Sequence, residues 1–167
     1  MDETARTEPP LVGDERATLT GFLQWHRETF AWKCAGLTTE QLRERNVPPS
    51  KLSLLGLVRH MAEVERGWFR RVLRGEDIPF RWKRGPGDDS PFEADEADPG
   101  EAFAAWEEEC ALACEIVDAT ESLDTTAEFE GTVYSLRWIL THMIEEYARH
   151  NGHADLIRER IDGATGE

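Results

Sequence analysis

The chain has 167 residues, and its 34 acidic and 19 basic side chains give a formal net charge of −15. Such an acidic surface repels phosphate backbones and anionic lipid headgroups, so neither nucleic acid nor a membrane surface is an expected partner. No stretch reaches the roughly 20 apolar residues of a membrane span, and the first residues lack the apolar segment of a signal peptide. The three cysteines have no disulfide-scaffold spacing, which favours a cytoplasmic protein.

The length fits one domain with a substantial core, which we place at residues 14–167 after a flexible N-terminal arm at residues 1–13. A first helix is predicted from Glu15 to Leu37, with Gly36 near its end. His26 falls on its apolar face, as a core-edge imidazole bonded to a neighbour or as a residue that lines a pocket. That face consists of Leu19, Phe22, Leu23, Phe30, Cys34 and Leu37.

A second helix is predicted to begin after Ser50 or Ser53, either of which can cap it, and to end at Arg74. His60 lies about 100° from the centre of its apolar stripe, at the boundary between core and solvent. Glu63, one turn further on the same side, is within reach of a hydrogen bond to His60. Taken alone, His60 is an ordinary boundary histidine. The stripe consists of Leu54, Leu57, Met61, Val64, Trp68 and Val72.

Residues 75–100 form a long connection with four prolines and four glycines. A connection this long is typical of a functional or a partly disordered segment. Its aromatic residues Phe80, Trp82 and Phe92 favour packing on the domain, where the segment could form one wall of a pocket.

A third helix is predicted from Pro99 to Ala119, with Asp98 as its N-cap. Cys110 and Cys114 lie four residues apart on its apolar face. They are either a soft-metal or redox pair or two small core residues, and we prefer the core, where free cysteines are often found. The whole face consists of Phe103, Trp106, Cys110, Ala113, Cys114 and Val117.

The longest predicted helix runs from Ser135 to Asp162 and carries three of the five histidines. At about 100° per residue, His150 lies about 20° from the centre of its apolar stripe, and Glu146 about 60° from it. A carboxylate and an imidazole four residues apart stack on one helix face, which here is the face expected to be buried. The stripe consists of Leu136, Ile139, Met143, Tyr147, Ala154, Ile157 and Ile161.

Burial of the Glu146 carboxylate costs several kcal/mol unless a partner compensates for it. A divalent metal bound by Glu146 and His150 would be such a partner, and a hydrogen bond between the two or a buried arginine is the alternative. His142 and His153 lie about 80 to 100° off the stripe, on the same flank as Glu146, and either joins the site or stays at a solvated boundary. Glu145 is predicted to point outward.

Four helices with apolar stripes predict an all-α protein, a four-helix bundle with a long connection between helices 2 and 3. Metal sites in bundles are formed by inward side chains of facing helices. In that fold, His60 of the second helix can meet Glu146 and His150 of the fourth.

The chain resembles the DinB-like superfamily of damage-inducible four-helix bundles in two stretches, LSLLGLVRHMAEVERGWFRRVLRGE (residues 52–76) and SLRWILTHMIEEYARHNGHADLIRERIDG (residues 135–163). It is most similar to an uncharacterised actinobacterial-type branch related to mycothiol-dependent maleylpyruvate isomerase. The resemblance extends from Leu19 to Gly163.

The resemblance implies a divalent-metal triad, with one ligand from the second helix and two from the fourth. The matching residues are His60, Glu146 and His150. Many members have His-x-x-x-His on the fourth helix, whereas this chain has the Glu-x-x-x-His pattern of the mycothiol-dependent isomerases. Three protein ligands leave positions open, as in catalytic metal sites. Two imidazoles and a carboxylate suit zinc or nickel first, with manganese or iron as alternatives.

The resemblance also implies a low-molecular-weight thiol (mycothiol, bacillithiol or glutathione) as co-substrate and a homodimer as the assembly. The leading hypothesis is a metal-dependent thiol S-transferase or isomerase in which the bound thiolate is the nucleophile. Candidate pocket residues are His26, Glu63, Tyr147 and His153, and no motif identifies a catalytic residue of the chain.

Two other functions fit the same residues. One is a metal-dependent hydrolase with the same triad, in which Glu63 or His153 acts as general base. The other is a non-enzymatic module that binds a small molecule or metal and dimerises through the exposed aromatic side chains of Trp25, Trp32 or Trp138.

Overall fold

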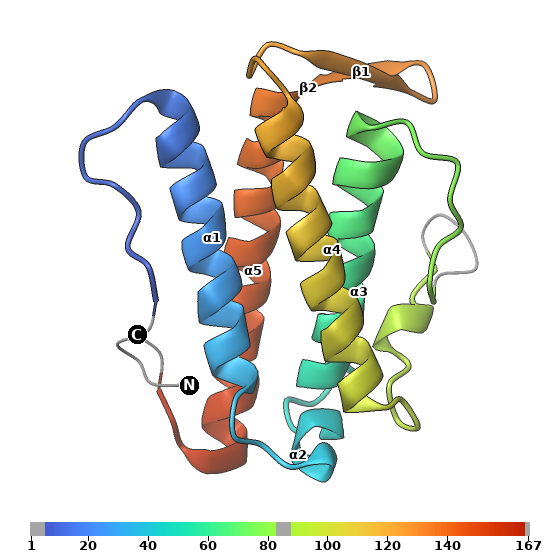
Figure 1. Ribbon diagram of the computed structural model, residues 1–167. Helices are drawn as coiled ribbons and strands as arrows, with labels where there is room; N and C mark the ends of the chain where they lie inside the picture. The colour runs from blue at the N-terminus through green and yellow to red at the C-terminus, as the bar shows by residue number, and fades with distance from the viewer. Residues whose placement is uncertain (1–5, 83–87, 166–167) are drawn as a thin grey trace. The chain divides into compact units, whose positions relative to one another are not determined.

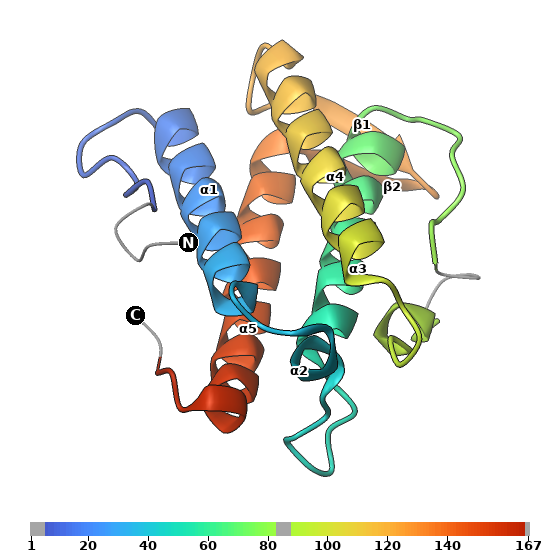
Figure 2. The same ribbon diagram turned by 60° about the horizontal axis from the view of Figure 1, so that its bottom comes forward.

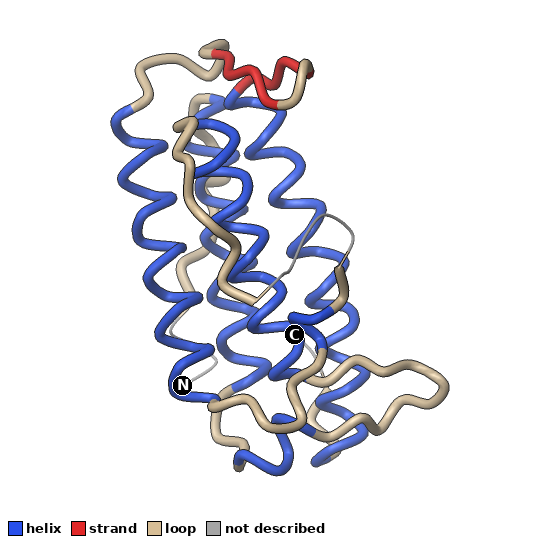
Figure 3. Tube along the Cα trace, turned by 90° about the vertical axis from the view of Figure 1, so that its right-hand side faces the viewer, coloured by secondary structure: helices blue, strands red, loops and turns tan. Residues whose placement is uncertain are grey.

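The computed structural model describes residues 6–82 and 88–165, and helices account for most of these ranges (Figure 3). Within them, the chain forms five α-helices and one two-stranded antiparallel sheet, so the all-α prediction is correct except for one hairpin. The chain divides into two compact units: unit 1 holds residues 1–54 and 140–167, and unit 2 holds residues 55–139. No helix in the described part is long and apolar enough to cross a membrane.

Unit 1 is built on two long helices that lie side by side, α1 (Glu15–Cys34) and α5 (Leu136–Asp162), as Figures 1 and 2 show. The first turn of α5, up to Ile139, is counted with unit 2. The short helix α2 (Thr39–Arg43) follows α1. Helix α1 ends at Cys34, three residues before the predicted end, because the chain turns at Gly36, where φ is +73°.

The predicted apolar stripe of α5 forms most of its buried face. Tyr147 is fully buried, and its ring packs on that of Phe30 of α1 in a T-shaped arrangement, with the centroids 6.2 Å apart. Arg158 ties the two helices together further along, because its Nη1 donates to the carbonyls of Lys33 (3.1 Å) and Ala35 (2.7 Å) at the end of α1. The main buried apolar side chains of unit 1 are Leu23, Phe30, Cys34, Leu140, Met143, Tyr147, Ala154 and Ile157.

The apolar face predicted for α1 is partly wrong. Phe22 is 43% exposed, whereas Arg27 and Lys33 are buried. Lys33 can be buried because its ammonium pairs with Asp155 of α5 at 2.7 Å and lies over the ring of Trp32. Residues 6–13 of the predicted N-terminal arm are described, and residues 1–5 lie outside the described ranges.

Unit 2 begins with α3 (Leu54–Glu65), whose first residue is counted with unit 1, and α3 continues directly as the π-helix η2 (Arg66–Leu73). The segment predicted as a single α-helix to Arg74 therefore changes from an α-helix to a π-helix at Arg66. That side chain is buried, and it donates from Nε to the Pro79 carbonyl at 2.9 Å and from Nη1 to Glu109 at 2.5 Å. Helical periodicity gives no sign of this change.

The rest of unit 2 comprises the 3-10 helix η3 (Ser90–Phe92), helix α4 (Pro99–Ala119) and a hairpin. The hairpin strands β1 (Thr126–Phe129) and β2 (Thr132–Ser135) pair antiparallel with Thr126 opposite Ser135. Residues 83–87 of the long predicted connection lie outside the described ranges.

The inward face of α4 differs from the prediction. Cys114 is exposed and Cys110 is half-buried, so the interpretation of the pair as two core residues is wrong for Cys114. The face instead includes Glu109, which is 1% exposed and accepts a hydrogen bond from Arg66. The centre of the buried face lies about 100° around the helix from the face on which Cys110 and Cys114 are central. The buried residues are Ala102, Ala105, Trp106, Glu109, Ala113, Ile116 and Val117.

The predicted helix ends of α4 and α5 are confirmed. Asp98 caps α4 by accepting a hydrogen bond from the Gly100 amide at 2.7 Å. The Ser135 hydroxyl accepts from the Trp138 amide at the start of α5, and Gly163 follows its end with φ of +77°. These local signals act within one helical turn, which is why they can be recognised without the tertiary structure.

Candidate metal centre

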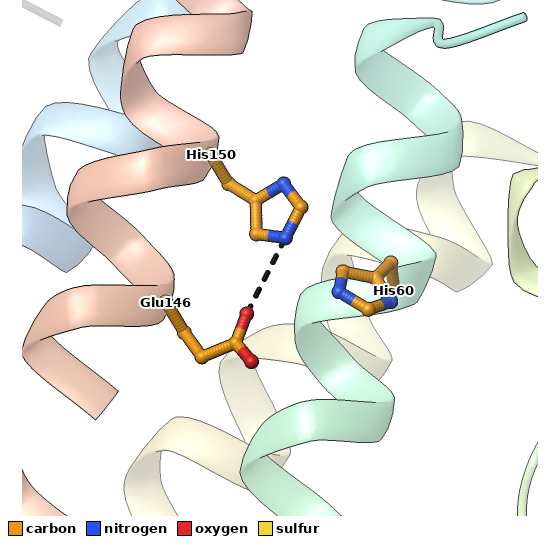
Figure 4. A group of neighbouring side chains, drawn as sticks. All are labelled: His60, Glu146 and His150. Carbon is orange, nitrogen blue, oxygen red and sulfur yellow. Dashed lines mark ion pairs between the residues drawn. The ribbon is translucent and has the colours of Figure 1, made fainter. Parts of the chain in front are cut away.

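The carboxylate of Glu146 lies between two imidazoles on α5. Its Oε2 is 3.4 Å from Nε2 of His150, the ion pair dashed in Figure 4, and its Oε1 is 3.4 Å from Nε2 of His142. His150 is 7% exposed and Glu146 is half-buried. The direct pair is therefore present, and its facing oxygen and nitrogen are the atom types that bind divalent metals.

The other ring nitrogen of His150 faces His153. The two Nδ1 atoms are 3.3 Å apart, so one nitrogen must carry the proton and the other must accept it. Burial lowers the pKa of His153, and the charges of His150 and Arg149 lower it further. A neutral His153 can accept the N–H of His150 and hold the ring with Nε2 toward Glu146. A histidine that binds a metal commonly uses its second nitrogen in this way.

His142 belongs to a second group of possible ligands, together with Glu145 and Glu146. One ligand atom from each lies within 4.8 Å of the others. Glu145 is exposed and also pairs with Arg149, so the prediction that it points outward is confirmed. This group comes from a single helix and lies nearer to solvent than His150.

His60 belongs to α3 in unit 2, and Glu146 and His150 belong to the part of α5 in unit 1. The His60 ring stacks on Phe92 of η3, with centroids 4.7 Å apart and an interplanar angle of 27°. The neighbouring Arg59 donates to the Glu93 carbonyl at 2.6 Å and lies over the ring of Trp82. The long connection thus packs on α3 through its aromatic residues, as predicted.

The other predicted pocket residues have different surroundings. Glu63 is buried in unit 2 and accepts a hydrogen bond from the Trp82 amide at 2.5 Å. Tyr147 is fully buried in the core of unit 1. His26 is half-buried at the edge of that core, and its carbonyl accepts from Asn151 Nδ2 at 3.0 Å.

Two residues that contact predicted site residues were not themselves predicted: Phe92, which stacks on His60, and Asn151, which donates to the His26 carbonyl. Phe92 was expected only to pack on the domain, because nothing in the sequence indicates which histidine an aromatic ring in a loop will meet. Asn151 could have been found, because the helical wheel places it about 80° from Met143, on the flank of α5 opposite Glu146.

The pKa of His26 leads to a testable pH dependence. Burial lowers it below the ordinary value of 6.5, so near that pH the unfolded chain binds more protons than the folded chain. We therefore expect the free energy of unfolding to fall as the pH is lowered from about 7.5 to about 5.5. The loss should be smaller in His26→Gln. Urea unfolding at both pH values measures the difference, and an equal loss in the two proteins would contradict this origin.

The geometry defines a mostly helical protein with a histidine-flanked carboxylate on its longest helix. A family model for mycothiol-S-transferases matches residues 18–163, and the chain belongs to that family. The match confirms the predicted relationship to the mycothiol-related DinB-like proteins, and it indicates a transferase-like enzyme that uses mycothiol. No curated protein matches the chain.

Proposed function

We propose that this protein is a divalent-metal-dependent transferase that joins mycothiol to a small electrophile, with His60, Glu146 and His150 as the metal ligands. The observation that carries the proposal is the Glu146–His150 pair on the inner side of α5 in a chain that belongs to the mycothiol-S-transferase family. Two imidazoles and one carboxylate form a ligand set that leaves positions open for a substrate. The proposal includes the arrangement of α1, α3, α4 and α5 as one four-helix bundle.

The thiol in this reaction comes from the substrate rather than from Cys34. Burial raises the pKa of the Cys34 thiol to about 12, so this cysteine stays protonated near neutral pH and cannot act as a nucleophile. A bound divalent metal would lower the pKa of a coordinating thiol. Within the chain, Glu146 and His150 would bind the metal, and His153 would orient the His150 ring.

The balanced reaction is a substitution at carbon. The mycothiol sulfur forms a bond to an electrophilic carbon, the bond from that carbon to its leaving group breaks, and the leaving group takes the electron pair. The thiol proton passes to the solvent. An isomerase that adds the thiol and later releases it would use the same activated sulfur and is the nearest alternative.

The test is conjugation of mycothiol to a fluorogenic alkyl halide. We expect a rate that depends on both mycothiol and metal, and that falls to the uncatalysed level after chelation or in His60→Ala. Glu159→Gln, an exposed change on the same helix, is the control and should keep its rate. A rate that survives chelation and His60→Ala would overturn the proposal. Turnover of an ester or amide without thiol would favour the metal-dependent hydrolase.

We also propose that the protein forms a homodimer through exposed aromatic side chains. Trp138 is 45% exposed, and the centroid of its ring lies 5.2 Å from that of Trp68 and 5.0 Å from that of Tyr134. Sedimentation would show whether this cluster associates with a second copy.

A further inference from the structure

Unit 1 contains a pocket of about 700 Å³ between α1, residues 6–8 and the C-terminal half of α5. Its α5 side is formed by Asn151 and Asp155, which lie about 140° and 180° around the helix from Glu146. On α5, the pocket thus lies away from the side chain of Glu146.

The aromatic part of this pocket already holds a cation. The guanidinium of Arg6 lies 4.4 Å from the ring centre of Trp25 and 4.7 Å from that of Trp32, and its Nη1 donates to the Thr29 hydroxyl at 3.2 Å. The Lys33 ammonium lies 4.0 Å from the Trp32 ring. Indole rings attract cations through the negative potential of their faces, so this side of α1 suits positively charged groups.

The α5 side of the pocket offers hydrogen-bond acceptors. Asn151 is 6% exposed, and its Nδ2 donates to the His26 carbonyl at 3.0 Å and lies 3.3 Å from His26 Nδ1. These two contacts identify the amide nitrogen. Its Oδ1 is buried and has no hydrogen-bond partner within residues 6–82 and 88–165. A buried acceptor without a donor is unfavourable, and a ligand N–H would satisfy it.

The charges of the pocket favour a cationic ligand once Arg6 is elsewhere. Glu8 and Asp155 then face the single positive charge of Lys33, which leaves a net charge of about −1. The net charge of −15 over the whole chain adds to the attraction of a cation.

We propose that this pocket is a binding site for a small organic cation that carries a guanidinium or ammonium group, and that Arg6 occupies its aromatic part when no ligand is bound. The ligand cation takes the place of Arg6 between Trp25 and Trp32. Its N–H groups donate to Asn151 Oδ1 and to the Asp155 carboxylate. Arg6 is then a competitor that any ligand has to displace.

The test uses methylguanidinium as the probe and neutral methylurea, which has nearly the same shape, as its comparison. Binding to the full chain is followed by the indole N–H signals in NMR, with Trp25→Phe used to assign the signal of Trp25. We expect Arg6→Ala to bind methylguanidinium about tenfold more tightly than wild type, because the competing cation is gone. Arg45→Ala removes the same charge at an exposed position and should bind as wild type does.

A second pair of variants tests the two parts of the site. In the Arg6→Ala background, Trp25→Leu should remove binding of methylguanidinium and Asn151→Ala should weaken it, while circular dichroism shows that the helices are kept. Equal binding of methylurea, no gain in Arg6→Ala, or full binding after Trp25→Leu would each overturn the proposal. No metal or thiol is present in these measurements, so they are independent of the proposed transferase activity.

Discussion

Wild-type protein purified without an affinity tag should contain a nearly stoichiometric amount of divalent metal, and His150→Ala should contain almost none. His150 is buried, its Nε2 faces Glu146 and its Nδ1 faces His153, so its loss removes a proposed ligand. Loss of a residue that only orients a ligand typically costs about 10–100-fold in metal affinity, and loss of the ligand should cost more. Mass spectrometry of the metal content measures the effect.

Two further variants on α5 serve as comparisons for the metal content of His150→Ala. His153→Ala should weaken metal binding by about 10–100-fold without abolishing it, because only the partner of Nδ1 is lost. Glu159→Gln changes an exposed carboxylate further along α5 and should keep the metal. Absence of metal from the wild type, even after incubation with zinc, nickel and manganese, would contradict the metal site. The Glu146–His150 pair would then be a structural ion pair.

The largest expected effect on stability is that of Glu109→Ala in unit 2. The Glu109 side chain is buried, and its Oε1 accepts from Arg66 Nη1 at 2.5 Å, Arg70 Nη1 at 3.3 Å and Arg81 Nε at 3.3 Å. Removal of this carboxylate leaves the buried Arg66 guanidinium without its anion. Breaking a buried ion pair from one side costs about 3–5 kcal/mol, and we expect the free energy of unfolding to fall by that amount.

The neighbouring residue provides the control for this prediction. Glu108 also pairs with Arg81, but its side chain is 56% exposed, so Glu108→Ala should cost less than about 1 kcal/mol. Urea unfolding of both variants, followed by circular dichroism, gives the comparison. Replacing both partners, as in Glu109→Leu with Arg66→Met, should recover part of the loss. Similar small losses for Glu108→Ala and Glu109→Ala would show that solvent screens the whole network.

The features that depend on neighbours within a few turns could be predicted from the sequence. The caps at Asp98 and Ser135, the end of α5 before Gly163 and the stripe that buries Met143 and Tyr147 all follow from local hydrogen bonding and from a period of 3.6 residues. The Glu146–His150 pair was predictable for the same reason, since a spacing of four residues places both on one face.

The contacts between residues far apart in the chain could not be predicted, because they form only when the helices pack. The buried pair of Arg66 and Glu109 decides which face of α4 points inward and leaves Cys114 exposed, although the sequence pattern favoured the cysteine face. The stacking of Phe92 on His60 and the burial of Asn151 beside His26 likewise join segments that no local pattern connects. Apolar periodicity indicates which side chains are buried away from water. A charged side chain is buried only where an oppositely charged or hydrogen-bonding partner contacts it, and the sequence does not show where that partner will lie.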